Sequence, residues 1–451
     1  MDWKTQKVLV AGSGKSGIGA TDLLKKVGAE VIIYDGNDKL KEEDVLNKLE
    51  NKEDVKVILG ELEDSVINEI DMMVLSPGIA IDAPFVLRVK EAGVPIWGEI
   101  ELAYVIGKGK LAAITGTNGK TTTTALVGEI MANYYDKVDV VGNIGNPYTT
   151  TAFDSTDDTV TVAEISSFQL ETIHTFKPDV SAVLNITPDH LNRHYTMECY
   201  TNVKMSIAMN QDANQPIILN YEDEILREYA PKLKNKIVWF SSKNKLEEGV
   251  YLDGKNIMYA ENGEKRVITT TEDTTLVGIH NVENIMAAIG ISVNMGVPDA
   301  VIKEAIKKFK AVAHRIEYVD TIDDVIYYND SKGTNTDASI KAIQAMTRPT
   351  VLIAGGYDKK VTFDEWAKEL DGKVKCLVLL GETSNQIADT AKYGFENIIF
   401  TKSLEEAIDE CKKNAQQGDA VLLSPACASW DMFDSYEQRG DMFKDYVKKL
   451  K

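Results

Sequence analysis

Short apolar runs that end in glycine or a polar residue recur along this chain, and helix-like stretches separate them. Examples are KVLVAG at 7–12, LAAIT at 111–115 and TVLIAGG at 350–356. A short run of this kind is typical of a strand buried on both faces, and alternation with helices is typical of a parallel sheet covered by helices. The pattern therefore predicts an α/β fold.

The length predicts more than one such unit. The chain has 451 residues, and about 150 residues make one domain. The expected strands fall into three groups: 7–12, 31–35, 72–76 and 94–99; then 111–115, 159–166 and 180–187; then 324–330, 350–356, 374–381 and 419–426. Between about 237 and 275, the short runs KIVWFS, GVYLD, NIMYA and RVITT predict a small antiparallel patch attached to the second sheet. We expect domains at 1–107, 108–310 and 311–451.

Composition excludes several classes of protein. Apolar residues make up 44% and charged residues 27%, which is ordinary for a folded globular chain. No apolar run approaches the length of a membrane span, and the first residues lack the features of a signal peptide, so we expect a cytoplasmic protein. The net charge of −20 disfavours a nucleic-acid partner. The four cysteines form no CxxC pair, which predicts reduced thiols rather than disulfides or zinc.

The first glycine-rich loop, GSGKSG at 12–17, follows a predicted strand and precedes a predicted helix. Its glycines, Gly14 among them, let backbone N–H groups approach a diphosphate at the helix N-terminus. Asp35 ends the next strand, at the spacing expected for an acid that binds a ribose hydroxyl. The loop predicts a Rossmann-like nucleotide site. The motif does not distinguish NAD from UDP, and a tight turn without a ligand is the alternative.

The second loop carries the stronger signal. It follows LAAIT and consists of Gly116, Thr117, Asn118, Gly119, Lys120, Thr121 and Thr122. Its backbone N–H groups would surround phosphates, Lys120 would reach the β and γ oxygens, and the Thr121 hydroxyl would bind Mg²⁺. The common P-loop has a glycine six residues before the lysine, whereas this chain has Ile114, so the loop is shorter. The Asn-Lys-x-Asp signature of guanine recognition occurs only at 51–54, before the loop.

Polar residues at other strand ends extend the predicted site. Glu164 would join Thr121 in binding Mg²⁺. His190 and His194 are four residues apart, but no third ligand is evident, so His190 beside a phosphate or Mg²⁺ is favoured over zinc. Asn281 is a candidate N-cap with Asn284 one turn later. Capping and adenine binding are equally consistent with these two residues.

The third group of strands ends in a further cluster. Arg315 lies at its entrance, where it would contact a phosphate, and the alternative is an exposed hinge arginine. Asp330 and Lys332 follow the first strand end and would form an anion and Mg²⁺–ATP edge. Lys359 and the 424–429 segment follow two more strand ends of the same sheet. Cys427 has no neighbouring histidine or other base, so we expect a structural role for it.

Read in order, several motifs are similar to those of the Mur ligase family of ATP-dependent amide-forming enzymes. They are TGTNGKTTT, EISSFQLE, NITPDHLNRH, GIHNVEN, AHR, NDSKGTN and SPACASWDMFDSYEQRG. The resemblance covers essentially the whole chain. It implies a Rossmann-like N-terminal domain that binds a UDP-substrate, a central P-loop ATPase-like domain that binds ATP, and a Rossmann-like C-terminal domain that binds an amino acid.

The resemblance also implies an activity. The GSGKSG loop, the SPGI motif and the last signature resemble most closely the members that add D-glutamate to UDP-N-acetylmuramoyl-L-alanine in peptidoglycan synthesis, through an acyl phosphate. ATP would be the cosubstrate, with two Mg²⁺ ions. A monomer without a nucleic-acid partner or a membrane span is expected.

Residue roles follow from the same resemblance. Gly14, Ser16, Asp35, Ser76 and Gly78 would surround the uridine diphosphate, and Asn143 would touch the muramoyl group. The loop from Gly116 to Thr122, with Asn281, Asn284, Arg315 and Asp330, would bind ATP. Lys332, Thr334, Lys359, Ser429 and Tyr436 would line the D-glutamate site. Thr121, Glu164, His190 and Lys204, the last as a carbamate, would hold the metal ions, and Lys120, His190 and Lys204 would be catalytic. Without the resemblance, Lys204 reads as an ordinary helix lysine.

Two residues depart from the family's pattern, and three other functions would use part of the same motifs. Lys15 and Trp430 stand where relatives often have apolar residues, leucine in some relatives at position 430, which leaves their roles open. A nicotinamide dehydrogenase would leave the second loop unexplained, and a non-enzymatic P-loop regulator would leave the C-terminal cluster without a role. Folylpolyglutamate synthase shares the central motifs but lacks a complete N-terminal domain of the UDP type.

Overall fold

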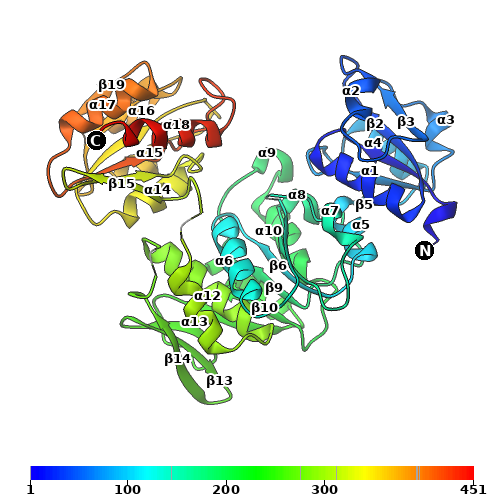
Figure 1. Cartoon of the computed structure of the whole chain (residues 1–451), viewed down its shortest axis with the longest axis horizontal. Helices are drawn as coiled ribbons and strands as arrows, with labels where there is room; N and C mark the ends of the chain where they lie inside the picture. The colour runs from blue at the N-terminus through cyan, green and yellow to red at the C-terminus, as the bar shows by residue number, and fades with distance from the viewer. Residues whose placement is uncertain (1, 144, 275, 311, 393–394, 396) are drawn as a thin grey trace. The chain divides into compact units, whose positions relative to one another are not determined.

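The computed structural model describes residues 2–143, 145–274, 276–310, 312–392, 395 and 397–451 (Figure 1). The described strands form three sheets, of five, nine and six strands. The chain divides into two compact units: Met1–Asp273 with Glu283–Lys308, and Thr274–Val282 with Phe309–Lys451. The first unit therefore contains two of the sheets, and the second unit contains the third. The expected α/β class is confirmed.

The N-terminal sheet is entirely parallel, with the strand order β3-β2-β1-β4-β5. Its strands are β1 (Lys7–Ala11), β2 (Glu30–Asp35), β3 (Val55–Leu59), β4 (Met72–Leu75) and β5 (Ile96–Gly98). Its helices are η1 (Trp3–Thr5), α1 (Lys15–Val27), α2 (Glu42–Leu46), α3 (Asp64–Ile67), α4 (Pro84–Glu91) and α5 (Glu99–Ile106).

The central sheet has the order β14-β13-β12-β11-β10-β9-β6-β8-β7. Its strands are β6 (Lys110–Thr115), β7 (Val138–Gly142), β8 (Val160–Glu164), β9 (Val180–Val183), β10 (Pro216–Asn220), β11 (Lys236–Ser241), β12 (Gly249–Asp253), β13 (Asn256–Glu261) and β14 (Glu264–Thr270). Its helices are α6 (Lys120–Ala132), α7 (Thr149–Ala152), α8 (Ser167–Leu170), α9 (Leu191–His194), α10 (Met197–Met205), η2 (Ser206–Ala208), α11 (Glu224–Tyr229), η3 (Ala230–Lys232), α12 (Ile279–Asn294) and α13 (Asp299–Lys308).

One expectation about this sheet is wrong. The run KIVWFS was placed in the antiparallel patch, but it forms β11, which is parallel to both β10 and β12. Antiparallel pairing starts only between β12 and β13 and continues to β14. The short turns that suggest hairpins are real between β12, β13 and β14, whereas the longer 242–248 segment allows β12 to run parallel to β11.

The C-terminal sheet has the order β15-β16-β20-β17-β18-β19, and only the β15–β16 pair is antiparallel. Its strands are β15 (Glu317–Ile322), β16 (Val325–Asn329), β17 (Thr350–Ala354), β18 (Val374–Leu379), β19 (Ile398–Phe400) and β20 (Ala420–Leu423). Its helices are α14 (Thr336–Ala345), α15 (Asp364–Lys368), α16 (Ser384–Ala391), α17 (Leu404–Asn414) and α18 (Tyr436–Lys448).

Apolar packing explains why the first two sheets form one unit. A single cluster of buried side chains contains Leu24 of α1, Leu102 of α5 and Phe176 beside the central sheet. Two other clusters cover the faces of the C-terminal sheet, with Trp366 in one and Phe443 in the other, both fully buried. Among the described residues, no helix is both long and apolar enough to cross a membrane.

Polar bonds add to this packing where α5 begins. The Gly98 N–H donates to the Thr172 carbonyl at 3.1 Å, and the Gln169 amide donates to Glu99 Oε1 at 2.8 Å. Glu99 is 1% exposed, and its Oε2 has no hydrogen-bond partner in the described part of the chain. Burial raises the pKa of Glu99 to about 7, against the hydrogen bond from Gln169 that lowers it. The folded protein therefore holds a proton there that the unfolded chain releases at lower pH.

The Glu99 carboxyl predicts a pH-dependent stability. Between the unfolded pKa of 4.5 and the folded pKa of about 7, the folded state binds more protons, so the unfolding free energy falls as pH rises, by at most ~1.4 kcal/mol per pH unit. Glu99→Gln keeps the shape and cannot ionise. We expect its melting temperature to match the wild type at pH 5 and to exceed it by about 4 °C or more at pH 8.

Differential scanning calorimetry at the two pH values measures this difference. Glu101→Gln is the matched control, because Glu101 accepts bonds from the backbone N–H groups of His174, Thr175 and Phe176. A neutral side chain there should lower the melting temperature at both pH values. An identical pH dependence in wild type and Glu99→Gln would contradict the prediction.

Candidate active site

The first predicted loop lies in the wall of a hollow of about 690 Å³ in the N-terminal sheet. Every residue predicted to surround a uridine diphosphate lines this hollow: Gly14, Ser16, Asp35, Ser76 and Gly78. The loop needs a glycine at position 17, because a Cβ there would lie 1.8 Å from the Gly12 carbonyl oxygen. The structure thus brings this set of predicted residues together at the start of α1.

The polar groups in the hollow suit a ligand with hydroxyls and phosphates. Asp35 Oδ2 accepts bonds from the Ser13 N–H at 3.0 Å and the Ser13 hydroxyl at 2.6 Å. Burial opposes ionisation of Asp35, but these bonds, one from the Asn37 N–H and the charge of Lys48 lower its pKa. Asp35 therefore stays ionised and accepts hydrogen bonds. Ser76 Oγ is buried without a partner in the described structure, which leaves a polar atom for a ligand to satisfy.

The second loop is held by side chains from beyond β9. The Asn118 N–H donates to Asn185 Oδ1 at 2.8 Å, and Asn185 Nδ2 donates to the Asn118 carbonyl at 3.0 Å. The Thr117 hydroxyl shares a hydrogen bond with the Tyr200 hydroxyl at 3.1 Å and accepts one from the Thr187 N–H at 3.0 Å. Gly119 caps α6 at φ +85°, where a Cβ would lie 2.3 Å from Asn284 Oδ1. Asn284 therefore lies directly against the loop.

Lys120 curls over the loop that precedes it. Its Nζ donates to the carbonyl oxygens of Gly116 and Thr117, both at 2.9 Å. Thr121 and Thr122 follow it in the first turn of α6 and are buried. A phosphate can bind here because three features meet. They are the start of a thirteen-residue helix, the Lys120 ammonium, and glycines that let a ligand come close to the backbone.

Glu164 ends β8 as predicted and is 1% exposed. The Asn143 amide donates to its Oε1 at 2.8 Å, whereas Oε2 is buried with no hydrogen-bond partner among the described residues. An orphaned carboxylate oxygen fits a divalent cation. The described residues contain no group of three or more His, Cys, Asp and Glu side chains that could hold a metal ion alone. Such a site matches Mg²⁺, which keeps waters and takes ligands from phosphates.

Lys204 lies on α10 and is 2% exposed. Its Nζ donates to the Gly116 carbonyl at 2.8 Å and lies 4.8 Å from the centre of the Tyr200 ring. Burial, together with the neighbouring Lys120 ammonium, lowers the pKa of Lys204 well below its ordinary value, although Asp189 and Glu164 oppose the shift. Lys204 therefore loses its proton more readily than an exposed lysine does.

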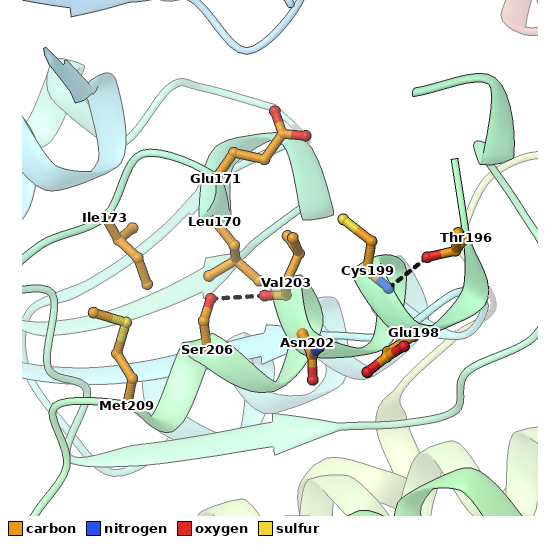
Figure 2. A pocket seen from close by; sticks show the side chains of 10 residues that line it. All are labelled: Leu170, Glu171, Ile173, Thr196, Glu198, Cys199, Asn202, Val203, Ser206 and Met209. Carbon is orange, nitrogen blue, oxygen red and sulfur yellow. Dashed lines mark hydrogen bonds between the residues drawn. The ribbon is translucent and has the colours of Figure 1, made fainter. Parts of the chain in front are cut away.

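A second hollow, of about 540 Å³, opens beside the same helix (Figure 2). It is lined by Leu170, Glu171, Ile173, Thr196, Glu198, Cys199, Asn202, Val203, Ser206 and Met209. The exposed Cys199 donates its backbone N–H to the Thr196 hydroxyl at 3.1 Å. None of the predicted site residues lines this hollow.

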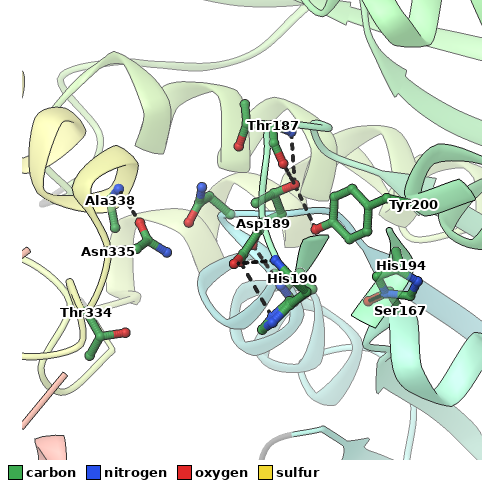
Figure 3. Close-up of polar contacts among 12 residues, drawn as sticks. Ser167, Thr187, Asp189, His190, His194, Tyr200, Thr334, Asn335 and Ala338 are labelled. Carbon is green, nitrogen blue, oxygen red and sulfur yellow. Dashed lines mark hydrogen bonds and ion pairs between the residues drawn. The ribbon is translucent and has the colours of Figure 1, made fainter. Parts of the chain in front are cut away.

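His190 precedes α9 in a left-handed conformation, with φ +52°. Its N–H donates to Asp189 Oδ1 at 2.9 Å, and its ring Nε2 lies 3.5 Å from Asp189 Oδ2 (Figure 3). His194 points elsewhere: its Nε2 lies 3.0 Å from the Ser167 hydroxyl and its Nδ1 3.5 Å from Glu171. Burial lowers the pKa of His194 to about 4, so its ring is neutral. The two histidines therefore have different partners.

In the second unit, Asp330 and Arg315 lie together. Asp330 is 1% exposed and accepts bonds from the Ser424 hydroxyl at 2.8 Å and the Ile316 N–H at 3.2 Å. Burial raises the pKa of Asp330 to about 6, against the charge of Arg315, which lowers it. Arg315 Nε is itself buried with no hydrogen-bond partner in the described structure. The arrangement leaves this guanidinium available to an anion.

The residues predicted for the amino-acid site also gather in this unit. Lys332 Nζ lies 5.5 Å from the centre of the Tyr436 ring, and Lys359 Nζ donates to the Thr334 carbonyl at 3.2 Å. Trp430 is 65% exposed, and Lys359 Nζ lies 5.7 Å from the centre of its ring. Ser429, by contrast, is 2% exposed, and its carbonyl accepts from two backbone N–H groups in the following turn.

Two sequence interpretations can be checked directly. Asn281 is not an N-cap, because α12 begins at Ile279 and the Asn281 side chain donates to the Val277 carbonyl at 2.7 Å. An asparagine inside the first turn can donate its side-chain amide to a preceding backbone carbonyl. Asn281 does so from within the helix instead of capping it from the position before. Cys427 is buried, and burial raises its thiol pKa to about 11, in agreement with the structural role that we expected.

Sequence reasoning missed Arg439, which holds the C-terminal cluster together. Its guanidinium is 2% exposed and donates to Ser331 Oγ at 2.9 Å, the Ser331 carbonyl at 2.8 Å and the Cys427 carbonyl at 3.3 Å. Burial lowers its pKa to about 10, which leaves it charged at neutral pH. Arg439 shares a face of α18 with the buried Phe443 and Val447. The sequence signal that could have indicated its burial is its spacing, which places it on the apolar face of the helix.

Comparison with known proteins gives three matches to family models. Residues 6–98 match the model described as Mur ligase MurD-like, N-terminal domain. Residues 114–292 match the Mur ligase middle domain, and residues 314–427 match the model described as Mur ligase, glutamate ligase domain. The matched ranges include strands from all three sheets.

Curated relatives are similar over the full length of both chains. One, named UDP-N-acetylmuramoylalanine–D-glutamate ligase, from Lachnospira eligens, is 57% identical over 100% of each chain. A relative of the same name from Clostridioides difficile is 48% identical over 100% of each chain. Among solved structures, UDP-N-acetylmuramate-alanine ligase MurC from Thermotoga maritima aligns with a TM-score of 0.61 at 18% identity, over 99% of this chain and 100% of that one. The MurF ligase of the same organism, in complex with ADP, aligns with a TM-score of 0.61 at 16% identity over 100% of both chains. These two structures share the fold.

We predict that the buried charge of Arg439 keeps the segment 424–436 ordered. Arg439→Met removes the donors but keeps much of the side-chain volume, leaving buried carbonyls without partners at a cost of about 3 kcal/mol. We expect hydrogen exchange at 424–436 to accelerate by about two orders of magnitude.

Hydrogen-exchange mass spectrometry on the full chain measures this change. Arg348→Met is the control, because Arg348 pairs with Asp324 at 3.3 Å with a third of its side chain exposed. That variant should leave exchange at 424–436 unchanged. Equal exchange in Arg439→Met and the wild type would refute the role given to Arg439.

Proposed function

The chain belongs to the Mur ligase family, and from that premise we propose that it joins D-glutamate to UDP-N-acetylmuramoyl-L-alanine with the conversion of ATP to ADP and phosphate. The observation that carries the proposal is the full-length similarity, at 57% and 48% identity, to two relatives named for this reaction. We assign residues 1–107 to the UDP-substrate, 108–310 to ATP and 311–451 to the amino acid. We expect the enzyme to act in the cytoplasm, because ATP and UDP-linked precursors are cytoplasmic metabolites. We also expect it to act as a monomer.

The hollow beside α1 supports the assignment of the UDP-substrate. Ionised Asp35 accepts hydrogen bonds, which suits a ribose hydroxyl, and the start of α1 with Ser16 suits a diphosphate. Ser76 Oγ supplies an unsatisfied polar atom in the same wall. Asn143 bonds to Glu164, which supports a place for the muramoyl group near the phosphate loop.

The second loop supports the assignment of ATP. Lys120 would move its ammonium from the loop carbonyls to the β and γ phosphate oxygens, and Asn284 lies against the loop at Gly119. The Thr121 hydroxyl and the orphaned Glu164 Oε2 would hold Mg²⁺, with His190 near a second ion. When bound, Mg²⁺ neutralises charge on the phosphates during transfer.

The chemistry needs two steps. The substrate carboxylate is a poor acyl donor because its leaving group would be oxide. Its oxygen attacks the γ phosphorus, the bond to the ADP oxygen breaks, and an acyl phosphate forms. The amine of D-glutamate then attacks the acyl carbon, and phosphate leaves from the tetrahedral intermediate with loss of a proton from nitrogen. Lys120 would stabilise the charge that develops on the phosphoryl oxygens.

We further propose that Lys204 carries a carbamate. A bare ammonium would repel Mg²⁺, whereas a carbamate is an anionic oxygen ligand. Its lowered pKa supports this assignment, because only a neutral amine attacks CO₂, forming a C–N bond and releasing a proton. The neighbouring Lys120 ammonium and Tyr200 ring would then surround the new negative charge.

The C-terminal cluster supports the assignment of the amino acid. Lys332 and Lys359 offer two cationic groups for the two carboxylates of D-glutamate. Thr334, Ser429 and Tyr436 lie on the loops and the helix start that surround them. We further assign Arg315 and Asp330 to ATP binding, since Arg315 Nε is buried without a hydrogen-bond partner among the described residues.

Phosphate release tests the proposed reaction. We expect release with ATP and UDP-N-acetylmuramoyl-L-alanine when D-glutamate is added, but not with L-glutamate, L-alanine or meso-diaminopimelate. Release with another amino acid would keep the ligase mechanism and move the enzyme to a different step. No release with any amino acid from a folded protein that binds ATP would reject the proposal and favour a regulator.

Lys120 gives a sharper test of the phosphate loop. Lys120→Ala should lower phosphate release by about two to three orders of magnitude, because a positioned cation is lost from the transition state. Binding of the UDP-substrate, measured by calorimetry, should be unchanged. Lys108→Ala, at an exposed position, is the surface control. Normal turnover in Lys120→Ala would exclude the role.

Lys204 can be tested both by a spectroscopic signal and by turnover. With ¹³C-labelled bicarbonate, we expect a carbamate carbon resonance in the wild type and none in Lys204→Ala. The alanine variant should also be inactive, and added short carboxylic acids should restore part of the activity. An active Lys204→Ala enzyme would refute a metal-bridging carbamate.

A further inference from the structure

Arg193 of α9 connects the wall of the N-terminal hollow to the central sheet. Its Nη2 donates to the Ile79 carbonyl at 2.8 Å and to Glu171 Oε2 at 2.5 Å, and its Nε donates to Glu171 Oε1 at 3.3 Å. Ile79 closes the turn that begins at Ser76, because its N–H donates to the Ser76 carbonyl at 3.0 Å. Both ends of this turn line the hollow. One guanidinium is thus bonded to the hollow and to a carboxylate of the central region.

The contact is buried and tightly constrained. The side chain of Arg193 is 13% exposed and that of Glu171 is 4% exposed. The guanidinium also lies 4.8 Å from the centre of the Phe168 ring. A planar group bonded at two edges and stacked on one face has no alternative position that keeps these contacts. A displacement of the turn at Ile79 must therefore be accompanied by a change at Arg193.

Phe168 extends the connection to the predicted catalytic histidine. Its ring centre lies 4.9 Å from that of His190 and 5.6 Å from that of His194. His190 is at the start of α9 in a left-handed conformation, and half of its side chain is exposed. The Phe168 ring therefore contacts both His190 and the Arg193 guanidinium. Figure 3 shows His190 beside Asp189, with His194 directed toward Ser167.

A second bond joins the same two regions on the surface. The Tyr195 hydroxyl donates to Asp82 Oδ2, and Tyr195 is 70% exposed. This bond also connects the segment after α9 to the loop after β4, but it ends on an exposed carboxylate. Removing this bond in Tyr195→Phe is therefore a matched control, because it weakens the contact between the two regions but leaves Phe168 and Arg193 in place.

We propose that Arg193 is a positioning residue that couples occupation of the N-terminal hollow to the orientation of His190. A ligand that contacts Ser76 and Gly78 fixes the turn and its Ile79 carbonyl. Arg193 then stays stacked on Phe168, and Phe168 keeps its ring contact with His190, which fixes the His190 orientation. The identity of the ligands rests on the proposed function: a UDP-linked substrate in the hollow and a magnesium nucleotide at the loop.

Binding calorimetry tests the coupling directly. The affinity of the wild-type enzyme for UDP-N-acetylmuramoyl-L-alanine is measured with and without saturating Mg²⁺–ADP. We expect the nucleotide to change this affinity by about 5-fold or more, the usual size of coupling between two sites. Because coupling is reciprocal, the UDP-substrate should change the affinity for the nucleotide by the same factor. Arg193→Lys keeps the charge but cannot form the fork. It should reduce the coupling factor to near one and lower kcat by about tenfold, while Tyr195→Phe keeps both.

Phe168→Leu separates positioning from a structural loss at Arg193. It removes the stack but leaves the bonds of Arg193 to Ile79 and Glu171. We expect unchanged affinity for the UDP-substrate alone, loss of coupling and a lowered kcat. Wild-type binding without coupling, or full coupling in Arg193→Lys or Phe168→Leu, would overturn the inference and leave the proposed function standing. A wild-type protein that does not bind the UDP-substrate would overturn both.

Discussion

The paired hydrogen bonds between Asn185 and the backbone of Asn118 fix the phosphate loop, and the surrounding groups take their positions from it. With the loop fixed, the Gly116 carbonyl accepts from both Lys120 and Lys204. A single backbone oxygen therefore draws two lysines together in a buried place. Their mutual repulsion adds to burial in lowering the pKa of Lys204, which is the condition that makes a carbamate chemically accessible. The loop geometry thus contributes to the lowered pKa of a residue 88 positions away.

The overall charge of −20 would oppose every anionic ligand proposed here, so recognition has to be local. Each predicted site offers a different group to an anion. The hollow offers the start of α1, the phosphate loop offers Lys120, and the second unit offers Lys332 and Lys359. Because a charge acts most strongly on a group in direct contact and distant surface charges are screened by salt, a few cations at a site outweigh many distant surface carboxylates. The acidic surface then contributes to solubility and disfavours phosphate backbones, while the sites keep their affinity.

Local signals predicted the buried strands and both loops, because apolar runs and glycine spacing depend only on neighbouring residues. Five strands were missed, β3, β7, β10, β15 and β19, and all except β10 lie at a sheet edge. At an edge, alternate side chains face solvent, and the apolar run is broken, as in VKVIL of β3. Residues held by distant partners were also missed. Arg439 and Arg193 act through carbonyls more than 100 positions away, and no spacing rule reports such pairs. The gathering of the predicted site residues into three places followed from the rule that parallel strands end at one edge.

The shared fold cannot by itself set the amino acid that is added. Two ligases with different names have this fold at 16% and 18% identity, so specificity must lie in side chains on the loops. In the second unit those loops present Lys359 between the Thr334 carbonyl and the Trp430 ring. Trp430 also packs against Tyr357, with ring centres 5.5 Å apart. A large aromatic side chain fixes the direction of a long flexible lysine more firmly than a leucine would, because the cation is attracted to the ring face. In the proposed amino-acid site, Trp430 would thus narrow the positions of a carboxylate bound to Lys359.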